Sequence, residues 1–186
     1  MQLAMRIRGF TVIELLVGIT IFAILMLLAL PTMQDFIHNT RIRNTADSIA
    51  NGVRLAQVEA IRRNQPVEFI LDADGWRVND PNPGPFTGTV QSENFSDAKN
   101  QLTIAAQPPG ALRLAFNAIG QYLNAPDPDI SPLAAPDPIA FINITTAAIA
   151  SPKDLRVVAT GPVGIRVCDP DFTNLLDPKT GSIACP

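Results

Sequence analysis

The hydrophobic positions of this chain change their spacing twice along its length. From Phe10 to Leu30 apolar residues follow one another almost without interruption, and Glu14 is the only charged residue among them. A helix needs about 20 apolar residues to cross the hydrocarbon core of a bilayer, so this run is long enough for one span. Arg6 and Arg8 precede the run and favour an N-terminus on the cytoplasmic side.

A second pattern begins after Pro31 and indicates that the helix continues. Apolar residues here recur at alternating steps of four and three, which places them on one stripe of an α-helix: Ile42, Ala46, Ile49, Val53, Ala56 and Ala60. Charged and polar residues occupy the other faces, so the stripe is predicted to pack on the protein's own sheet. Pro31 removes a backbone donor and is expected to kink the helix. Because Pro66 ends it, the helix is predicted over residues 10–64, about 80 Å long.

From Val67 onward the spacing becomes the alternation of β-strands. Val67, Phe69 and Leu71 share one face, and Asp74-Gly75 predicts a hairpin turn. Residues 79–101 and 124–138 are rich in proline and polar residues, which indicates exposed loops. Further strands are predicted at Leu102–Ala106, Leu112–Phe116, Gly120–Leu123, Ile139–Ile144, Leu155–Thr160 and Ile165–Cys168. The fold class is therefore α+β, with one long helix packed on an antiparallel sheet.

Charge and histidine content narrow the function classes. The net charge is -3 and the isoelectric point about 5.0, and the acidic excess lies after the helix, which argues against broad binding to nucleic acid. The single histidine, His38, lies in the predicted helix, so a Ser/His/Asp or Cys/His site in the domain is excluded. The spacing of Asp127, Asp129 and Asp137 does not match a calcium loop. We expect no enzyme activity, no cofactor and no bound metal.

The start of the apolar run matches a known processing signal. A secretory signal peptide has a shorter apolar core and a small-x-small cleavage site, which this run does not offer. The segment Arg8-Gly9-Phe10-Thr11-Val12-Ile13-Glu14-Leu15-Leu16-Val17 resembles the class III signal of type IV pilins and pseudopilins. The resemblance implies the type IV pilin fold, cleavage between Gly9 and Phe10 by a prepilin peptidase, N-methylation of Phe10, and a role for Glu14 in assembly.

Cleavage would give the carboxylate of Glu14 a partner. It creates an α-amino group at Phe10, which is largely cationic at neutral pH. A carboxylate and an ammonium group in a low-dielectric environment are each costly alone and much cheaper as a pair. In the family, this pair forms within one subunit or between neighbours. Met1 and Met5 are both candidate starts that yield the same mature protein.

The resemblance also divides the chain into three parts. Residues 1–9 are the expected leader, residues 10–64 the pilin helix with residues 10–30 in the membrane, and residues 65–186 a periplasmic β-rich domain. The expected location is a single pass through the inner membrane with the C-terminal domain in the periplasm, followed by incorporation into an extracellular pilus. Expected partners are other major and minor pilins, the prepilin peptidase and the inner membrane.

Features of the C-terminal part favour one group within this family. The chain resembles the GspH/FimT group of minor pilins and pseudopilins in its Arg62-Arg63-Asn64 helix end, its hairpin with Trp76, and Arg166-Val167-Cys168-Asp169. Two cysteines in an exported domain predict a disulfide between Cys168 and Cys185, similar to the disulfide loop of minor pilins. We therefore expect a structural minor pilin that primes or caps pilus assembly. The alternative is a pseudopilin at the tip of a type II secretion pseudopilus.

DNA binding for natural transformation is a further alternative. Some minor pilins of this group bind DNA through a Gly-Arg-x-Arg motif before the cysteine, and here only the second arginine, Arg166, is present, with Gly164 in place of the first. The candidate DNA-binding residues are Arg166, Arg156, Lys153 and Lys179. Acidic residues intersperse them, which weakens the attraction for phosphate: Asp154, Asp169, Asp171 and Asp177.

Overall fold

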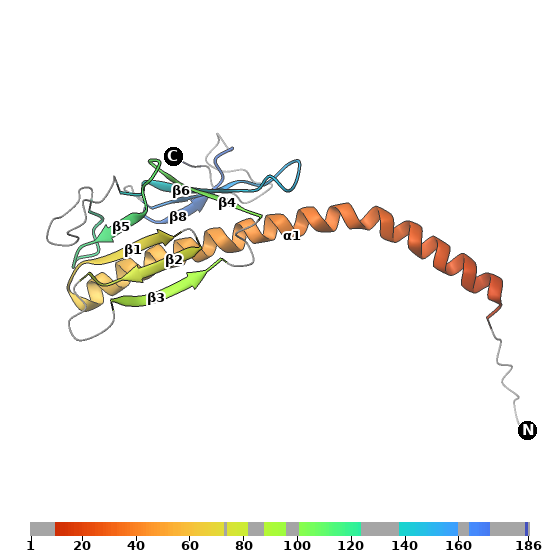
Figure 1. Ribbon diagram of the computed structural model, residues 1–186, viewed down its shortest axis with the longest axis horizontal. Helices are drawn as coiled ribbons and strands as arrows, with labels where there is room; N and C mark the ends of the chain where they lie inside the picture. Colours follow the sequence, from red (N-terminus) through yellow and green to blue (C-terminus); the bar gives the residue numbers. More distant parts are fainter. Residues whose placement is uncertain are drawn as a thin grey trace, which may run out of the picture. The chain divides into compact units, whose positions relative to one another are not determined.

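The long helix α1 (Val12–Arg63) is the first element of the computed structural model and supplies residues to two compact units, Met1–Ile37 and His38–Pro186. The structure describes residues 10–72, 74–81, 88–95, 101–123, 138–159, 164–171 and 185, with the side chains of residues 28–32 outside this set. Figure 1 shows α1 in red to yellow and the strands that follow it in the sequence.

In the first unit, α1 exposes its apolar side chains. Every side chain from Phe10 to Leu27 is exposed, and the helix continues through Pro31 without a break. Within the part of the chain that the structure describes, no helix has an apolar stretch that is long enough to cross a membrane. The span predicted over residues 10–30 includes side chains that lie outside the described set.

The first of two antiparallel sheets begins directly after the helix. It contains four strands in the order β3-β2-β1-β5, namely β1 (Val67–Asp72), β2 (Gly75–Asn79), β3 (Thr89–Asn94) and β5 (Arg113–Phe116). In the β1–β2 hairpin, Phe69 pairs with Val78 and Leu71 pairs with Trp76, and all four side chains are buried. Opposite residues of an antiparallel pair point to the same face, so this face of the sheet forms part of the core.

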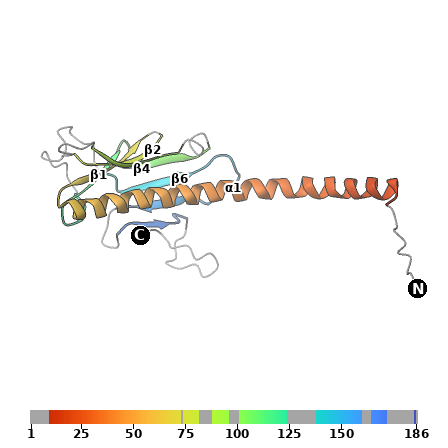
Figure 2. The ribbon, with the colours of Figure 1, turned by 90° about the horizontal axis from the view of Figure 1, so that it is seen from below.

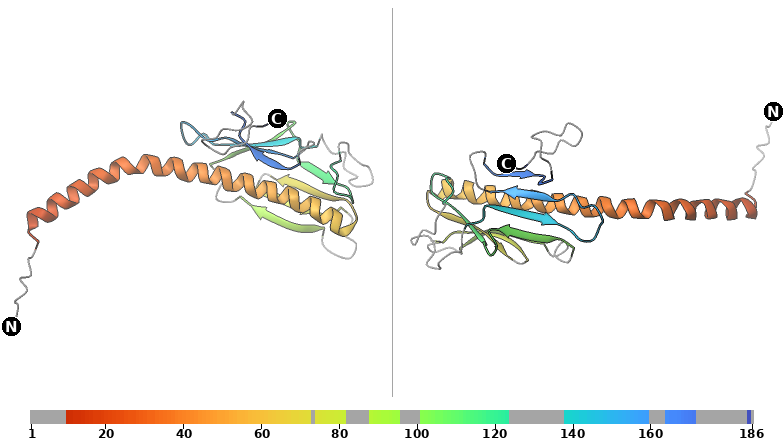
Figure 3. Two further views of the ribbon diagram at one scale, coloured as in Figure 1. Left: turned by 180° about the vertical axis from the view of Figure 1, so that it is seen from behind. Right: turned by 90° about the horizontal axis from the view of Figure 1, so that it is seen from above.

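The second sheet has the order β4-β6-β7-β8, and Figure 3 shows it from two sides. Its strands are β4 (Thr103–Gln107), β6 (Phe141–Thr145), β7 (Leu155–Val158) and β8 (Arg166–Cys168). Ile142 pairs with Val157, and both side chains are fully buried on the inner face. The neighbouring row of Asn143, Arg156 and Cys168 therefore points to the opposite face.

The core of the second unit lies between α1 and the two sheets, whose strands run alongside this part of the helix (Figures 1 and 2). The predicted stripe forms its helical side, and each member of the stripe is fully buried: Ile42, Ala46, Ile49, Val53, Ala56 and Ala60. Four further core positions come from both sheets: Phe69, Val78, Ile144 and Val157. The predicted fold, a long helix packed against antiparallel strands, is confirmed.

Gly52 lets the first sheet approach the helix closely. A Cβ atom at this position would lie 2.8 Å from Cδ2 of Trp76 and 2.9 Å from Cε2 of Phe69. The Trp76 ring is held in place because its Nε1 donates a hydrogen bond of 2.9 Å to Oγ of Ser48, one helical turn before Gly52. The absence of a side chain at Gly52 is therefore a requirement of the packing rather than of the backbone conformation.

Parts of the predicted strand pattern are wrong. The sequence predicts an exposed loop over residues 79–101, but β3 lies within it. β3 is an edge strand whose side chains are mostly exposed on both faces, so it lacks the apolar alternation that identifies a strand. A strand is predicted over residues 120–123, but only an isolated bridge between Phe116 and Tyr122 forms there. The strands also divide into two sheets where a single one is predicted.

A network of charged side chains joins the end of α1 to the end of β2. Glu59 accepts hydrogen bonds from Arg62 at 2.6 Å and from Arg63 at 2.8 Å, and Arg63 also donates to Asp80 at 3.0 Å. Gln65 donates a further bond of 2.6 Å to Asp80, whose side chain is 2% exposed. The hydrogen bond from Arg62, together with the one from Arg63, lowers the pKa of Glu59 below its ordinary value of 4.5, although burial opposes this.

The Gly52 contact predicts that Gly52→Val destabilises the protein. The added side chain must displace two buried rings, and overpacking of this kind costs about 1–3 kcal/mol. The free energy of unfolding, measured by denaturant titration of the detergent-solubilised full-length chain, should fall by that amount. Asn44→Val, which places the same side chain at an exposed position of α1, is the matched control. Equal effects of the two substitutions would show that helix propensity, and not packing, is responsible.

The charged network predicts a pH dependence for the contribution of Glu59. Because the pKa of Glu59 is lower in the folded state, its stabilising effect is present above pH 4.5 and is lost as the pH falls through the folded-state pKa. The stability difference between the wild type and Glu59→Gln should therefore shrink on acidification below pH 4.5. The measurement is denaturant unfolding of both proteins at several pH values.

Glu68 provides a control, because its contribution to stability should change with pH in the opposite direction. Burial raises the pKa of Glu68 above 4.5, and its ion pair with Arg113 at 3.0 Å only partly compensates. A raised pKa means that the wild type loses stability relative to Glu68→Gln as the pH rises above 4.5 through the folded-state pKa. The same pH trend for both variants would contradict the assignment of the two carboxylates.

Candidate functional site

The N-terminus of α1 is closed by a reciprocal set of hydrogen bonds between Thr11 and Glu14. The backbone N–H of Thr11 donates to Oε2 of Glu14 at 3.0 Å, and the hydroxyl of Thr11 donates to the same oxygen at 3.0 Å. In return, the backbone N–H of Glu14 donates to Oγ1 of Thr11 at 3.3 Å. This arrangement is a capping box, which satisfies backbone donors that the first turn of a helix leaves without partners.

The capping box holds the Glu14 carboxylate beside the start of the helix. Phe10 precedes the helix, and its side chain is 90% exposed. Consecutive backbone nitrogens of one chain lie roughly 3–4 Å apart, so the nitrogen of Phe10 is next to the Thr11 nitrogen that Glu14 already binds. Gly9 lies outside the described residues, and so does the predicted cleavage bond on its carboxyl side.

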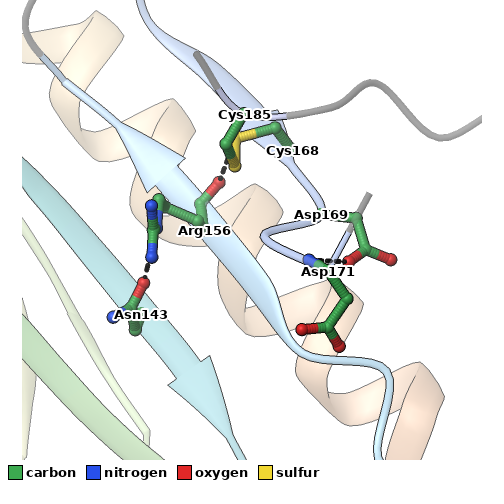
Figure 4. Close-up of a disulfide and its surroundings, with 6 residues drawn as sticks. All are labelled: Asn143, Arg156, Cys168, Asp169, Asp171 and Cys185. Atoms are coloured by element: carbon green, nitrogen blue, oxygen red, sulfur yellow. Dashed lines mark hydrogen bonds between the residues drawn. A yellow bond between two sulfur atoms is a disulfide. The ribbon is translucent and has the colours of Figure 1, made fainter. Parts of the chain in front are cut away.

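A second candidate site lies on the outer face of the second sheet. Arg156 pairs with Cys168 and Val158 pairs with Arg166, so both arginines point to the same face of neighbouring strands. The guanidinium of Arg156 lies 4.2 Å from the centre of the Phe141 ring. Its Nε donates a hydrogen bond of 2.8 Å to Oδ1 of Asn143 (Figure 4). Arg156 is therefore held in one orientation by partners within the sheet.

The remaining predicted DNA-binding residues differ from Arg156 in their contacts. Nε of Arg166 is buried and has no acceptor in the described part of the chain. Lys153 is exposed, but the contact that it makes is through its backbone N–H, which donates to Asn39 at 3.0 Å. Lys179 lies outside the described residues. Of the four candidate DNA-binding residues, the structure thus brings together Arg156 and Arg166.

The disulfide lies on the same face as Arg156, and acidic residues follow it in the sequence. Cys168 and Cys185 are joined with their Cα atoms 5.2 Å apart, and Sγ of Cys168 lies 3.6 Å from the carbonyl oxygen of Arg156. Asp169 follows Cys168 directly and accepts a hydrogen bond of 2.9 Å from the backbone N–H of Asp171 (Figure 4). Asp169 and Asp171 follow β8 directly in the sequence, and their carboxylates offset the positive charge that Arg166 brings to this strand.

The described residues contain no group of three His, Cys, Asp or Glu side chains that could hold a metal ion. The N-terminal site consists of a carboxylate, a hydroxyl and a backbone terminus. The sheet site consists of arginines, an aromatic ring and an amide. Side chains of these kinds bind and position partners, so the arrangement supports recognition and assembly.

Comparisons with known proteins identify both parts of the chain. The model of the prokaryotic N-terminal methylation motif matches residues 4–30, and the model described as type II transport protein GspH matches residues 45–161. A comparison with curated protein sequences gave no significant match.

Solved structures of two proteins are similar in fold. One is the type IV minor pilin FimU of Pseudomonas aeruginosa, at 12% identity and a TM-score of 0.45, covering 67% of this chain and 90% of that chain. The other is GspH of E. coli, at 21% identity and a TM-score of 0.44, covering 73% of this chain and 94% of that chain.

The methylation motif and the long helix on antiparallel sheets define a subunit of the pilin and pseudopilin class. The chain belongs to the GspH family, whose model covers most of the second unit. Proteins of this family are structural rather than enzymatic, and this chain is a minor pilin or pseudopilin of a type IV pilus or type II secretion system. Membership implies processing by a prepilin peptidase, anchoring in the inner membrane and assembly with other pilins.

The sequence interpretation missed two features of these sites. One is the role of Thr11, although the Thr-x-x-Glu spacing just before an apolar run is a recognised signal of a capping box. The other is the pairing of Arg156 with Phe141 and Asn143. No sequence signal was available for that contact, because it depends on the register between β6 and β7.

The capping box predicts that Thr11→Val loosens the first turn of α1. The substitution keeps the shape of the side chain but removes the acceptor of the Glu14 amide, at a cost of about 1 kcal/mol. Hydrogen exchange of the Glu14 amide in detergent should accelerate about fivefold, while core amides such as that of Ile49 stay unchanged. Thr11→Ser retains the hydroxyl and should exchange like the wild type. Slow exchange in Thr11→Val would mean that the box does not protect this turn.

Proposed function

We propose that this protein is a minor type IV pilin, a structural subunit that primes or caps pilus assembly. The observation that carries this proposal is that every side chain from Phe10 to Leu27 is exposed, whereas the stripe of the second unit is fully buried. The described core of the second unit consists of residues from Ile42 onward. The apolar half of α1 is therefore free for other surfaces, which are the bilayer before assembly and other pilin helices afterwards.

The proposed maturation connects the leader to the assembly site. The prepilin peptidase cleaves between Gly9 and Phe10, and the amine of Phe10 is then methylated. Glu14 pairs with this amine in its own chain or in a neighbour, and the pair neutralises two charges that would be costly in an apolar environment. The capping box supports pairing within the chain, because it already holds the carboxylate beside the Phe10 nitrogen. Residues 65–186 form the periplasmic domain in this proposal.

Two alternatives remain within the family. A pseudopilin at the tip of a type II secretion pseudopilus shares the same helix and processing, and the Cys168–Cys185 disulfide supports the pilus over it. Neighbouring genes would separate the two, since pilus-assembly genes and secretion genes cluster with their own subunits. A DNA-uptake role is supported by the shared face of Arg156 and Arg166. It is opposed by the acidic Asp169 and Asp171, which follow β8 in the sequence.

The proposal predicts different defects for two substitutions at the N-terminus. Gly9→Ser should leave an uncleaved precursor, visible as a band of higher mass on a gel. Glu14→Ala should be cleaved normally but enter filaments at least about tenfold less, since a buried charge without its partner costs several kcal/mol. The measurement is the amount of the protein in sheared filaments.

Thr20→Ala is the matched control for Glu14→Ala. Thr20 is a polar residue of the same apolar segment, but its hydroxyl donates to the carbonyl oxygen of Val17 at 2.8 Å and needs no partner from another chain. This variant should be cleaved and assembled like the wild type. Normal filament incorporation of Glu14→Ala would refute the pairing with the Phe10 amine.

A further inference from the structure

Exposed large apolar side chains are few in the described part of the second unit, and most of them gather at one place. Four are exposed by half or more, namely Val58 (57%), Ile61 (53%), Leu112 (51%) and Ile119 (69%). Val58 and Ile61 are neighbours on the exposed face of α1, three residues apart. Ile119 belongs to the turn that follows β5, and this turn packs on the same part of the helix. We call Val58, Ile61 and Ile119 the apolar patch.

The turn that carries Ile119 is built from several hydrogen bonds. Oδ1 of Asn117 accepts from the backbone N–H of Ile119 at 3.2 Å and from that of Gln121 at 2.8 Å. The backbone N–H of Gly120 donates to the carbonyl oxygen of Asn117 at 2.8 Å, and the φ angle of Gly120 is +76°, which favours glycine. Ile119 is therefore presented to solvent in a fixed position and not on a loose loop.

Two contacts hold this turn against α1. Nε2 of Gln57 donates a hydrogen bond of 2.9 Å to the carbonyl oxygen of Gly120. A Cβ atom at Gly120 would lie 2.6 Å from Cδ1 of Ile61, so the turn rests directly on that side chain. The helix and the turn thus form one surface. The backbone that carries these three aliphatic side chains is fixed, so little backbone entropy is lost on binding, which suits an interface anchor.

Arginines flank the apolar patch along the helix. Arg54 and Arg62 lie four residues before and after Val58, which places them on the same face. Arg54 donates to Oδ1 of Asn51 and to the carbonyl oxygen of Ile165, but to no carboxylate among the described residues. Arg62 pairs with Glu59, yet its side chain remains 62% exposed. Arg54 therefore gives the rim of the patch a positive charge that no described carboxylate offsets, and the guanidinium of Arg62 adds exposed donors.

We propose that the apolar patch docks a second, different pilin-family subunit of the same filament, through an apolar side chain that lies beside a carboxylate. The choice of partner rests on charge complementarity. A two-fold contact between copies of this chain would bring Arg54 and Arg62 of one copy against the same arginines of the other. A partner with an acidic residue beside its apolar centre meets no such repulsion. This inference rests on the proposed filament function and adds the surface and the kind of subunit that it receives.

The test uses the full-length chain, co-expressed with each of the other pilin-family subunits of its own filament system and purified from detergent by an affinity tag. Recovery of one such subunit with the wild type is expected. Ile119→Asp should reduce that recovery roughly tenfold or more, as expected for a charge placed at an interface anchor. Leu112→Asp adds the same charge to another exposed apolar residue, next to the other end of β5, and should leave recovery unchanged.

A second variant tests the positive rim. Arg54→Glu should reduce recovery of the same subunit, and replacing the facing carboxylate of the partner by lysine should restore it. Thermal unfolding of each variant confirms that the fold is intact. If misfolding is found for Ile119→Asp, Arg54→Glu with its charge-swap partner decides the question. Three outcomes would each overturn the proposal. They are loss of recovery with Leu112→Asp, self-association that is lost with Ile119→Asp, and full recovery with both Ile119→Asp and Arg54→Glu.

The Glu14 experiment and the apolar-patch experiment test different claims, so either claim can be refuted without the other. If Glu14→Ala assembles normally while Ile119→Asp loses its partner, the docking surface stands and the amine pairing does not. If Ile119→Asp retains every partner in detergent while Glu14→Ala is absent from filaments, the filament function stands and the patch is not its docking surface.

Discussion

Close approach between α1 and two sheets is the constraint on which the rest of this structure depends. The helix meets both sheets with small residues, Ala46, Ala56 and Ala60 on the stripe and Gly52 beside it, and all of them are buried. At Gly52 the rings of Trp76 and Phe69 occupy the space that a side chain would need. A larger residue at this point would move the β1–β2 hairpin away from the helix. The hairpin also ends at Asp80, so the same approach brings that buried carboxylate to Arg63 at the end of the helix.

The same helix divides the protein into surfaces with different tasks. Its core face is buried by the domain, whereas the apolar side chains of Phe10 to Leu27 are exposed among the described residues. Its first turn places Glu14 beside Phe10, and its last exposed turns carry Val58 and Ile61. A subunit built in this way can contact a bilayer or other helices with one end and a neighbouring domain with the other. The two proposed contacts use separate residues, and none of these residues belongs to the buried core.

The sequence predicted those features that depend on local spacing. The stripe from Ile42 to Ala60 and the methylation motif were found because each repeats or aligns within a short segment, and the comparisons and the buried positions confirm the fold and the family. β3 was missed because an edge strand exposed on both faces has no apolar period. The Gly120–Leu123 segment was misassigned because it pairs with the end of β5 only through the Phe116–Tyr122 bridge, directly after the turn that Asn117 holds. The contact of Arg156 with Phe141 was beyond prediction, since it joins residues of different strands whose register the sequence does not specify.

The partners of the exposed arginines help to decide whether this domain binds another subunit or DNA. Binding to a polyanion needs positive charge that no carboxylate compensates. On the outer face of the second sheet, Arg156 is already stacked on a ring and bonded to an amide, and two aspartates follow Cys168. On the exposed face of α1, Arg54 has amide and carbonyl partners but no described carboxylate, and it adjoins apolar side chains. Apolar side chains beside a cation match a protein partner better than a nucleic acid backbone, because a phosphate chain offers nothing to cover them. The charge pattern of this domain therefore favours a neighbouring subunit as the primary partner.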